Sequence, residues 1–215
     1  MVFGEINLDE VIYLFVLLLI GMGPKIALVP FLDATADMEM AMKKKVANTM
    51  VRTAVGMAIF LVVLGGILMR LLHFTPGAIQ IAGGIVLLLI SLSMVGNPGK
   101  EPDAENIKGR DPMKLAFYPL AVPYLLNPAG IAILIIASGT IDALLPGVAT
   151  IGVVLLVGAI DMLIFRNINV LAKYLDQSRL IVTESIFGVL LAALAVQLAL
   201  EGLRDLGIIA LDILH

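Results

Sequence analysis

The sequence predicts an all-α membrane protein whose six transmembrane helices form two inverted three-helix repeats, with helices 1 and 4 broken near the midplane. Three observations support this prediction. Of the 215 residues, 60% are hydrophobic and only 14% are charged, and the mean hydropathy is +1.07. Six stretches are long and apolar enough to cross a bilayer. The basic residues gather in three of the segments between these stretches. A soluble domain of this length carries more charge on its surface.

Each predicted span contains roughly 20 mostly apolar residues, the length that crosses the hydrocarbon core. The spans are residues 10–32, 53–72, 77–97, 115–138, 144–165 and 182–203. The first span is expected to remain in the membrane, because the acidic start MVFGEINLDE lacks the basic region of a cleavable signal. The predicted organisation is one membrane domain, with a first repeat at 1–97, a cytoplasmic linker at 98–114 and a second repeat at 115–215.

The distribution of basic residues predicts the orientation in the membrane. Segments 33–52, 98–114 and 166–181 hold eleven of the fourteen Lys and Arg residues. Loops rich in Lys and Arg stay in the cytoplasm, so both termini are expected outside it, in a multi-pass protein of the plasma or inner membrane. Because each half has three helices, the second half enters the membrane from the opposite side, as in the inverted repeats of secondary transporters.

Helices 1 and 4 are predicted to be broken. Helix 4, KLAFYPLAVPYLLNPAGIAILIIAS (114–138), contains three prolines together with Asn127 and Gly130, and helix 1 carries Gly23-Pro24 at the corresponding place. Proline removes a backbone N–H and clashes with the preceding turn. A broken span is tolerated only against protein or a water-filled cavity. Paired interruptions in the two halves therefore indicate a binding site at the midplane, and kinks with only a packing role are the alternative.

The broken ends suggest what such a site binds. One half-helix presents N–H groups and suits a carboxylate, whereas the other presents C=O groups and suits an ammonium group. Two facing breaks flanked by small residues therefore suit a small zwitterion. The amide of Asn127 can donate and accept, or it can bond a neighbouring helix instead. The predicted substrate-binding residues are Gly23, Pro24, Lys25, Ala27, Asn127, Pro128, Ala129 and Gly130.

Charged residues within the spans are the candidates for proton or ion coupling. Lys25 and Asp161 lie at similar predicted depths and are expected to form an ion pair, although Lys25 can also extend to the cytoplasmic interface. Asp161 and Glu184 are the predicted proton carriers, with Glu184 at the start of helix 6 as a helix-dipole partner in the alternative interpretation. Gln80 and Gln197 are expected to bridge helices.

Three segments resemble the MarC family of six-helix integral membrane proteins. They are IQIAGGIVLLLISLSMV (79–95), PLAVPYLLNPAG (119–130) and ESIFGVLLAALAVQLALEGL (184–203), and the resemblance covers essentially the full length. Helix 1 of the family usually has Asn/Asp-Pro-x-Gly-x-x-Pro, whereas here it has GPKIALVP (23–30). Helix 4 usually has Gly-Pro-Gly, whereas here it has Asn-Pro-Ala-Gly (127–130).

The resemblance implies a secondary transporter, because some members of that family are described as transporters of small neutral amino acids. The expected substrate is a small polar solute such as alanine or glycine, with possible proton or sodium coupling. A small-solute channel or exporter and a non-transporting membrane scaffold are the alternatives. Neither an enzyme nor a cofactor or metal site is predicted, since the chain has no cysteine, two histidines and no catalytic or phosphate-binding motif. The composition excludes a nucleic-acid module, and the oligomeric state is open.

Overall fold

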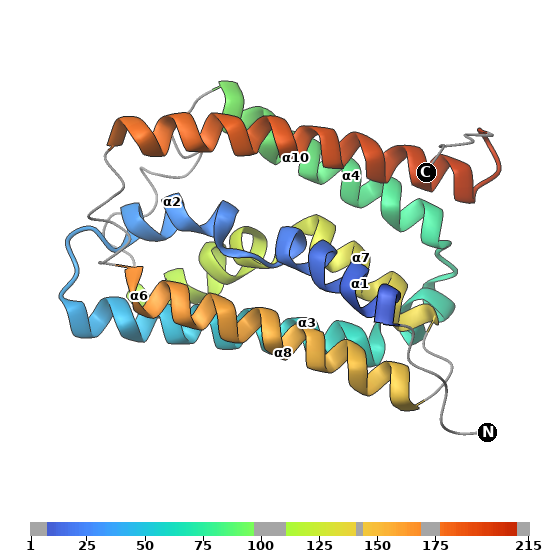
Figure 1. Cartoon of the computed structure of the whole chain (residues 1–215), viewed down its shortest axis with the longest axis horizontal. Coiled ribbons are helices and arrows are strands. Elements are labelled where there is room, and N and C mark those ends of the chain that lie inside the picture. Colours follow the sequence, from blue (N-terminus) through green and yellow to red (C-terminus); the bar gives the residue numbers. More distant parts are fainter. Residues whose placement is uncertain (1–7, 97–110, 141–143, 169–176, 210–215) are drawn as a thin grey trace.

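The computed structural model describes residues 8–96, 111–140, 144–168 and 177–209, and these residues form helices without any strand (Figure 1). The helices are α1 (Leu8–Gly21), α2 (Pro24–Ala34), α3 (Met40–Leu72), α4 (Pro76–Gly96), α6 (Pro112–Leu115), the irregular η1 (Ala116–Leu125), α7 (Pro128–Thr140), α8 (Leu144–Arg166) and α10 (Gln177–Asp205).

Within the described residues, four helical stretches are long and apolar enough to cross a membrane. They are Leu8–Ala34, Met40–Leu72, Pro76–Ser93 and Leu145–Arg166. A fifth is the pair Pro112–Leu125 and Pro128–Gly139, which bends by 72° at the predicted break in helix 4. The sixth predicted segment, 182–203, lies in α10. The all-helical fold and the multiple apolar helices confirm the predicted class, whereas the inverted relation of the two halves stays a prediction.

The second predicted helix continues into the basic segment that precedes it: residues 38–50 could form a membrane-surface helix or continue the second span, and the structure shows the continuation. Residues 53–72 were expected to span the membrane, but α3 runs unbroken from Met40 to Leu72. Its 33 residues reach about 50 Å at 1.5 Å per residue, so its basic first turns extend beyond a hydrocarbon core of about 30 Å. Lys43, Lys44 and Lys45 therefore lie at the same end of the bundle as α6 and the end of α8 (Figure 1).

Small residues set the helix packing. Gly65 and Gly66 bring α3 against α7, where the Gly66 N–H donates to Ser138 Oγ at 2.8 Å. In α4, Gly83 lies against Ala132 of α7, and Gly84 packs on α10. Glycines let the backbones of apolar helices approach closely, and the van der Waals packing that results helps to hold helices together in lipid.

The bundle consists of two unequal groups of helices. The larger core joins α1, α2, α3, η1, α7 and α8, while α4 and α10 lie side by side along most of their length (Figure 1). A small cluster links this α4–α10 pair to the rest through Leu87 and Leu191 on one side and Ile26 and Ala129 on the other. Large apolar side chains point outward from both groups, as expected for a surface in contact with lipid.

Candidate functional site

The first helix is broken between Gly21 and Pro24, where the sequence predicted. Gly23 is the N-cap of α2 and has extended backbone angles, φ −89° and ψ 168°. Pro24 occupies the first position of the new helix, which needs no N–H donor and suits the fixed φ of proline. The chain therefore ends one helix and starts another within two residues, in the middle of the bundle (Figure 1).

The second break, between Leu125 and Pro128, begins with a distorted segment. Tyr118 and Val122 have extended angles, φ −139° and ψ 125°, because each precedes a proline, whose ring disfavours the helical conformation of the residue before it. Asn127 then caps α7, since its Oδ1 accepts from the Gly130 N–H at 3.0 Å. Asn before Pro at the first helical position is a strong start signal for a helix.

The two breaks meet each other inside the bundle. The backbone N–H of Asn127 donates to the Gly21 carbonyl at 2.9 Å, and Asn127 Nδ2 donates to the Ile20 carbonyl at 2.8 Å. The backbones of Gly21 and Gly130 touch, so a side-chain carbon at either position would overlap the other residue. We call this contact, formed by Ile20, Gly21, Asn127 and Gly130, the break junction.

The break junction is closed in this structure. Asn127 is 1% exposed, and Ala27 and Ala129 are fully buried. The carbonyls at the end of α1 and the N–H at the start of α7 are paired through Asn127 rather than left open for a solute. Asn127 thus acts here as the bond to a neighbouring helix that the sequence left as an alternative. Gly23 is buried and Pro24 and Pro128 are half-buried beside this contact.

Asp161 is a buried carboxyl group next to the first break. It is 0% exposed, and neither of its oxygens has a hydrogen-bond partner among the residues that the structure describes. One turn before it, Gly158 lies against Val55 of α3, with Met22 at 4.0 Å; one turn after it, Phe165 packs on Phe31, near the end of α2, with ring centroids 5.1 Å apart. Asp161 therefore lies between a contact of α8 with α3 and a contact of α8 with α2. An unpaired carboxylate at such a position costs several kcal/mol, so this group favours a proton or a partner.

The other two charged candidates are placed only by their backbones. Lys25 lies in the first turn of α2, but its side chain is outside the described residues, so the ion pair with Asp161 stays a prediction. The side chain of Glu184 is also outside them. Because α10 begins at Gln177, Glu184 lies about two turns inside it, and the alternative interpretation as a first-turn residue is wrong.

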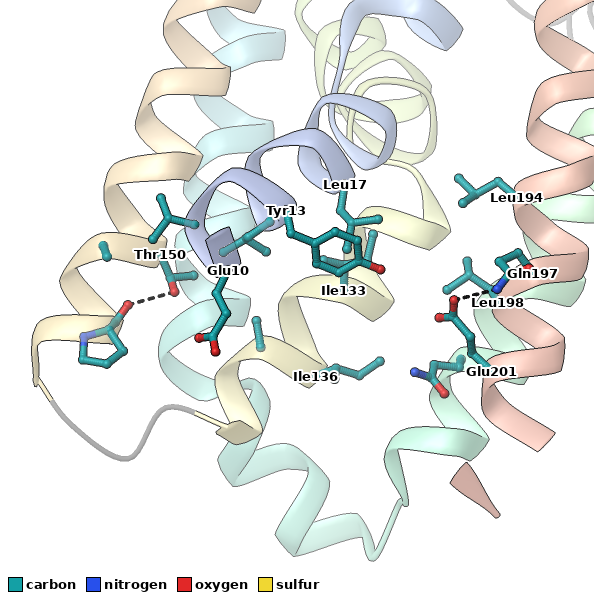
Figure 2. Close-up of a pocket in the computed structure, with 16 residues that line it drawn as sticks. Glu10, Tyr13, Leu17, Ile133, Ile136, Thr150, Leu194, Gln197, Leu198 and Glu201 are labelled. Atoms are coloured by element: carbon teal, nitrogen blue, oxygen red, sulfur yellow. Dashed lines mark hydrogen bonds between the residues drawn. The ribbon is translucent and has the colours of Figure 1, made fainter. Parts of the chain in front are cut away.

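A cavity that the sequence did not predict is lined by the first turns of α1 and the last turns of α10 (Figure 2). The first turns of α1 lie at the end of the bundle opposite the basic turns of α3 (Figure 1). The volume of the cavity is about 520 Å³, and α1, α4, α7, α8 and α10 line it. None of the predicted site residues belongs to its wall. Its polar lining residues are Glu10, Tyr13, Gln80, Thr150, Gln197 and Glu201.

The hydrogen bond of Gln197 differs from the expected bridge between helices, and the spacing of the polar residues in the cavity wall is a sequence signal that the predictions did not use. Gln197 Nε2 donates to Glu201 Oε1 at 2.9 Å on its own helix, so this bond does not bridge helices. Glu10, Tyr13 and Leu17 recur at intervals of three and four residues, which places them on one face of α1. The same spacing relates Gln197 to Glu201. Two polar helix faces in apolar spans were thus visible in the sequence, but not that they face each other.

Comparison with known proteins decides the family. A model described as the MarC family of integral membrane proteins matches residues 8–207. The chain belongs to the MarC family. A UPF0056 membrane protein of Aquifex aeolicus (strain VF5) is 28% identical over 152 residues, which cover 68% of this chain and 70% of the relative. A UPF0056 membrane protein of Methanocaldococcus jannaschii is 26% identical over 176 residues, covering 81% of this chain and 86% of the relative. No solved structure matches the chain significantly.

Membership in the MarC family makes the chain a multi-pass integral membrane protein, in agreement with its apolar helices. The names of the two relatives state a membrane protein and no substrate. Within the described residues, no group of three or more His, Asp or Glu side chains is placed to hold a metal ion.

Proposed function

We propose that this MarC protein is a secondary transporter of a small polar solute, with a small neutral amino acid such as alanine or glycine as the favoured substrate. The observation that supports the proposal is the break junction, where two interrupted helices from the two halves of the chain meet inside an apolar bundle. Interrupted helices in corresponding positions form the substrate sites of many secondary transporters.

The bonds of the break junction define what a solute would replace. If α1 and α7 separate, the Ile20 and Gly21 carbonyls lose their donors and suit an ammonium group. The start of α7 suits a carboxylate once the Asn127 cap is released. A small zwitterion matches both ends, and the glycines leave no room for a large side chain. The closed structure is then the state without solute, and solute binding shifts the population toward an opened junction.

Asp161 is the proposed coupling residue. It is buried, lacks a partner among the described residues and lies on a part of α8 that packs on α3 and on α2, the helix whose first turn holds Lys25. Intramembrane carboxyl groups carry protons in many pumps and transporters. In this proposal, Asp161 gains and loses a proton, or pairs with Lys25, as the junction opens and closes. Glu184 is a second candidate carrier, and sodium is the alternative coupling ion.

The proposed orientation follows from the charge distribution. The basic first turns of α3, Lys114 of α6 and Arg166 of α8 lie at one end of the bundle (Figure 1). The positive-inside rule assigns this end to the cytoplasm of a cell with the protein in its plasma or inner membrane. Both termini are then outside the cytoplasm, and the chain consists of two inverted three-helix repeats around the break junction.

Uptake of labelled alanine and glycine into proteoliposomes tests the proposal, with empty liposomes and labelled leucine as controls. Accumulation of the small solutes above the external concentration supports a coupled carrier. Equilibration without accumulation would instead indicate a channel or facilitated pore. Absence of flux, together with no solute-dependent thermal shift of the purified protein, would indicate a scaffold and refute transport of these solutes.

A further inference from the structure

The cavity described above lies between the two groups of helices. Residues of α1, α7 and α8 form one side of it, and residues of α4 and α10 form the other (Figure 2). Its volume of about 520 Å³ is within the usual range for sites that bind small organic molecules. Leu17 lies one helical turn before Gly21, so the inner end of the cavity approaches the break junction without including it.

The polar groups of the cavity wall favour a positively charged ligand. The charged residues in the lining of this cavity are Glu10 and Glu201, both acidic, and no Lys, Arg or His is among the described residues that line it. Gln80 Oε1 is buried without a hydrogen-bond partner among the described residues. The Tyr13 hydroxyl points toward the Gln197–Glu201 pair on the opposite side (Figure 2). Oxygen atoms of Gln80, Glu201 and Tyr13, the last of which is 60% exposed, therefore line a space in which a cation would find several hydrogen-bond acceptors.

The rest of the wall is apolar. Leu17, Ile133, Ile136, Leu194 and Leu198 face the same space. An inorganic cation would leave this apolar surface unused, and hard cations need several oxygen ligands at short range. An anionic headgroup would meet the acidic side chains. We propose that this cavity binds a small organic cation, with its ammonium group between Glu201, Gln80 and Tyr13 and its apolar body against Leu17, Ile133 and Leu194.

This inference goes beyond the proposed transport function and does not depend on it. The cavity is a separate site from the break junction, and binding at the cavity is measurable in detergent without any transport. The ammonium group can come from a simple amine or from an amino acid, and the two sources are separable with suitable probes.

The test exploits the absence of cysteine from the chain. The Leu194→Cys variant of the full chain, purified in detergent, carries a single thiol in the cavity wall. The rate of its modification by a maleimide reagent is measured with n-butylammonium, n-butanol and butyrate at equal millimolar concentrations. Butylammonium is expected to slow the modification, whereas the neutral and anionic probes of the same size are not. A parallel measurement with alanine identifies an amino acid as the source if alanine also protects, and a simple amine if it does not.

Two further variants in the Leu194→Cys background locate the ammonium group. Glu201→Gln should raise the concentration needed for protection about tenfold, because it replaces a charge-assisted hydrogen bond with a neutral one. Asp205→Asn removes an exposed carboxylate one turn further along α10, outside the cavity lining, and should leave protection unchanged. Circular dichroism confirms that the variants keep their helix content. Equal protection by all three butyl probes, or protection by none, would overturn the proposal and leave lipid or detergent as the occupant.

Discussion

The break junction predicts a large effect of truncating Asn127. Asn127→Ala removes the donor to the Ile20 carbonyl and the acceptor of the Gly130 N–H, while the backbone bond to Gly21 remains. Two buried backbone groups then lack partners, each at a cost of about 1–3 kcal/mol. Hydrogen bonds between membrane helices average about 0.6 kcal/mol, which lowers the total. We expect the variant to lose about 2–4 kcal/mol of unfolding free energy.

The measurement is reversible unfolding in mixed micelles, with the SDS fraction as denaturant and circular dichroism as the signal, since the chain has no tryptophan. The matched control is Asn167→Ala, which removes one exposed bond from Asn167 Nδ2 to the Leu163 carbonyl at the end of α8. This control should change stability by less than about 0.5 kcal/mol. Equal stabilities for the two alanine variants would refute the view that Asn127 holds the two broken helices together.

Three further predictions use the same unfolding assay. Gly130→Ala should destabilise the protein by at least about 2 kcal/mol, because the added carbon overlaps Gly21. The control Gly152→Ala, with no atom within 4 Å of the added carbon, should be neutral or slightly stabilising, and similar losses of stability in both variants would contradict the close contact. Ser138→Ala should lower the free energy of unfolding by about 1 kcal/mol, because the Gly66 N–H loses its acceptor between α3 and α7. The control Ser93→Ala loses only a hydrogen bond within its own helix and should lower it by less; the reverse order would contradict the packing of α3 on α7. Asp161→Leu should raise the free energy of unfolding by about 1–4 kcal/mol, because an apolar side chain replaces a buried carboxyl group that has no hydrogen-bond partner among the described residues. A clear loss of stability would show that Asp161 has a partner on which the fold depends.

The fold was predictable where the cause is local. Gly23-Pro24 and Asn127-Pro128 mark the two helix breaks because proline cannot continue a helix and suits only its first turn. The close approach of helices at Gly65, Gly66, Gly83 and Gly84 has a cause of the same local kind, because glycine is the residue that permits it.

The unpredicted features depend on contacts between distant segments. Nothing near Asn127 in the sequence shows that its amide bonds the end of α1, more than one hundred residues earlier. The cavity combines a face of α1 with a face of α10, and each face alone resembles an ordinary span with a few polar residues. For residues 38–50 the sequence left open a surface helix or a continuation of the second span, because the charged residues 43–45 lie outside any apolar core and their packing does not decide; the structure shows the continuation.

The most direct test of the transport proposal compares the wild-type chain with Asp161→Asn in proteoliposomes, with and without an inward proton gradient. The proposal predicts that the gradient drives accumulation of labelled alanine by the wild type and that Asp161→Asn abolishes the accumulation while keeping its fold. Gradient-driven accumulation that persists in Asp161→Asn would contradict the role of Asp161, and no gradient-dependent uptake by the wild type would contradict proton-coupled transport of alanine.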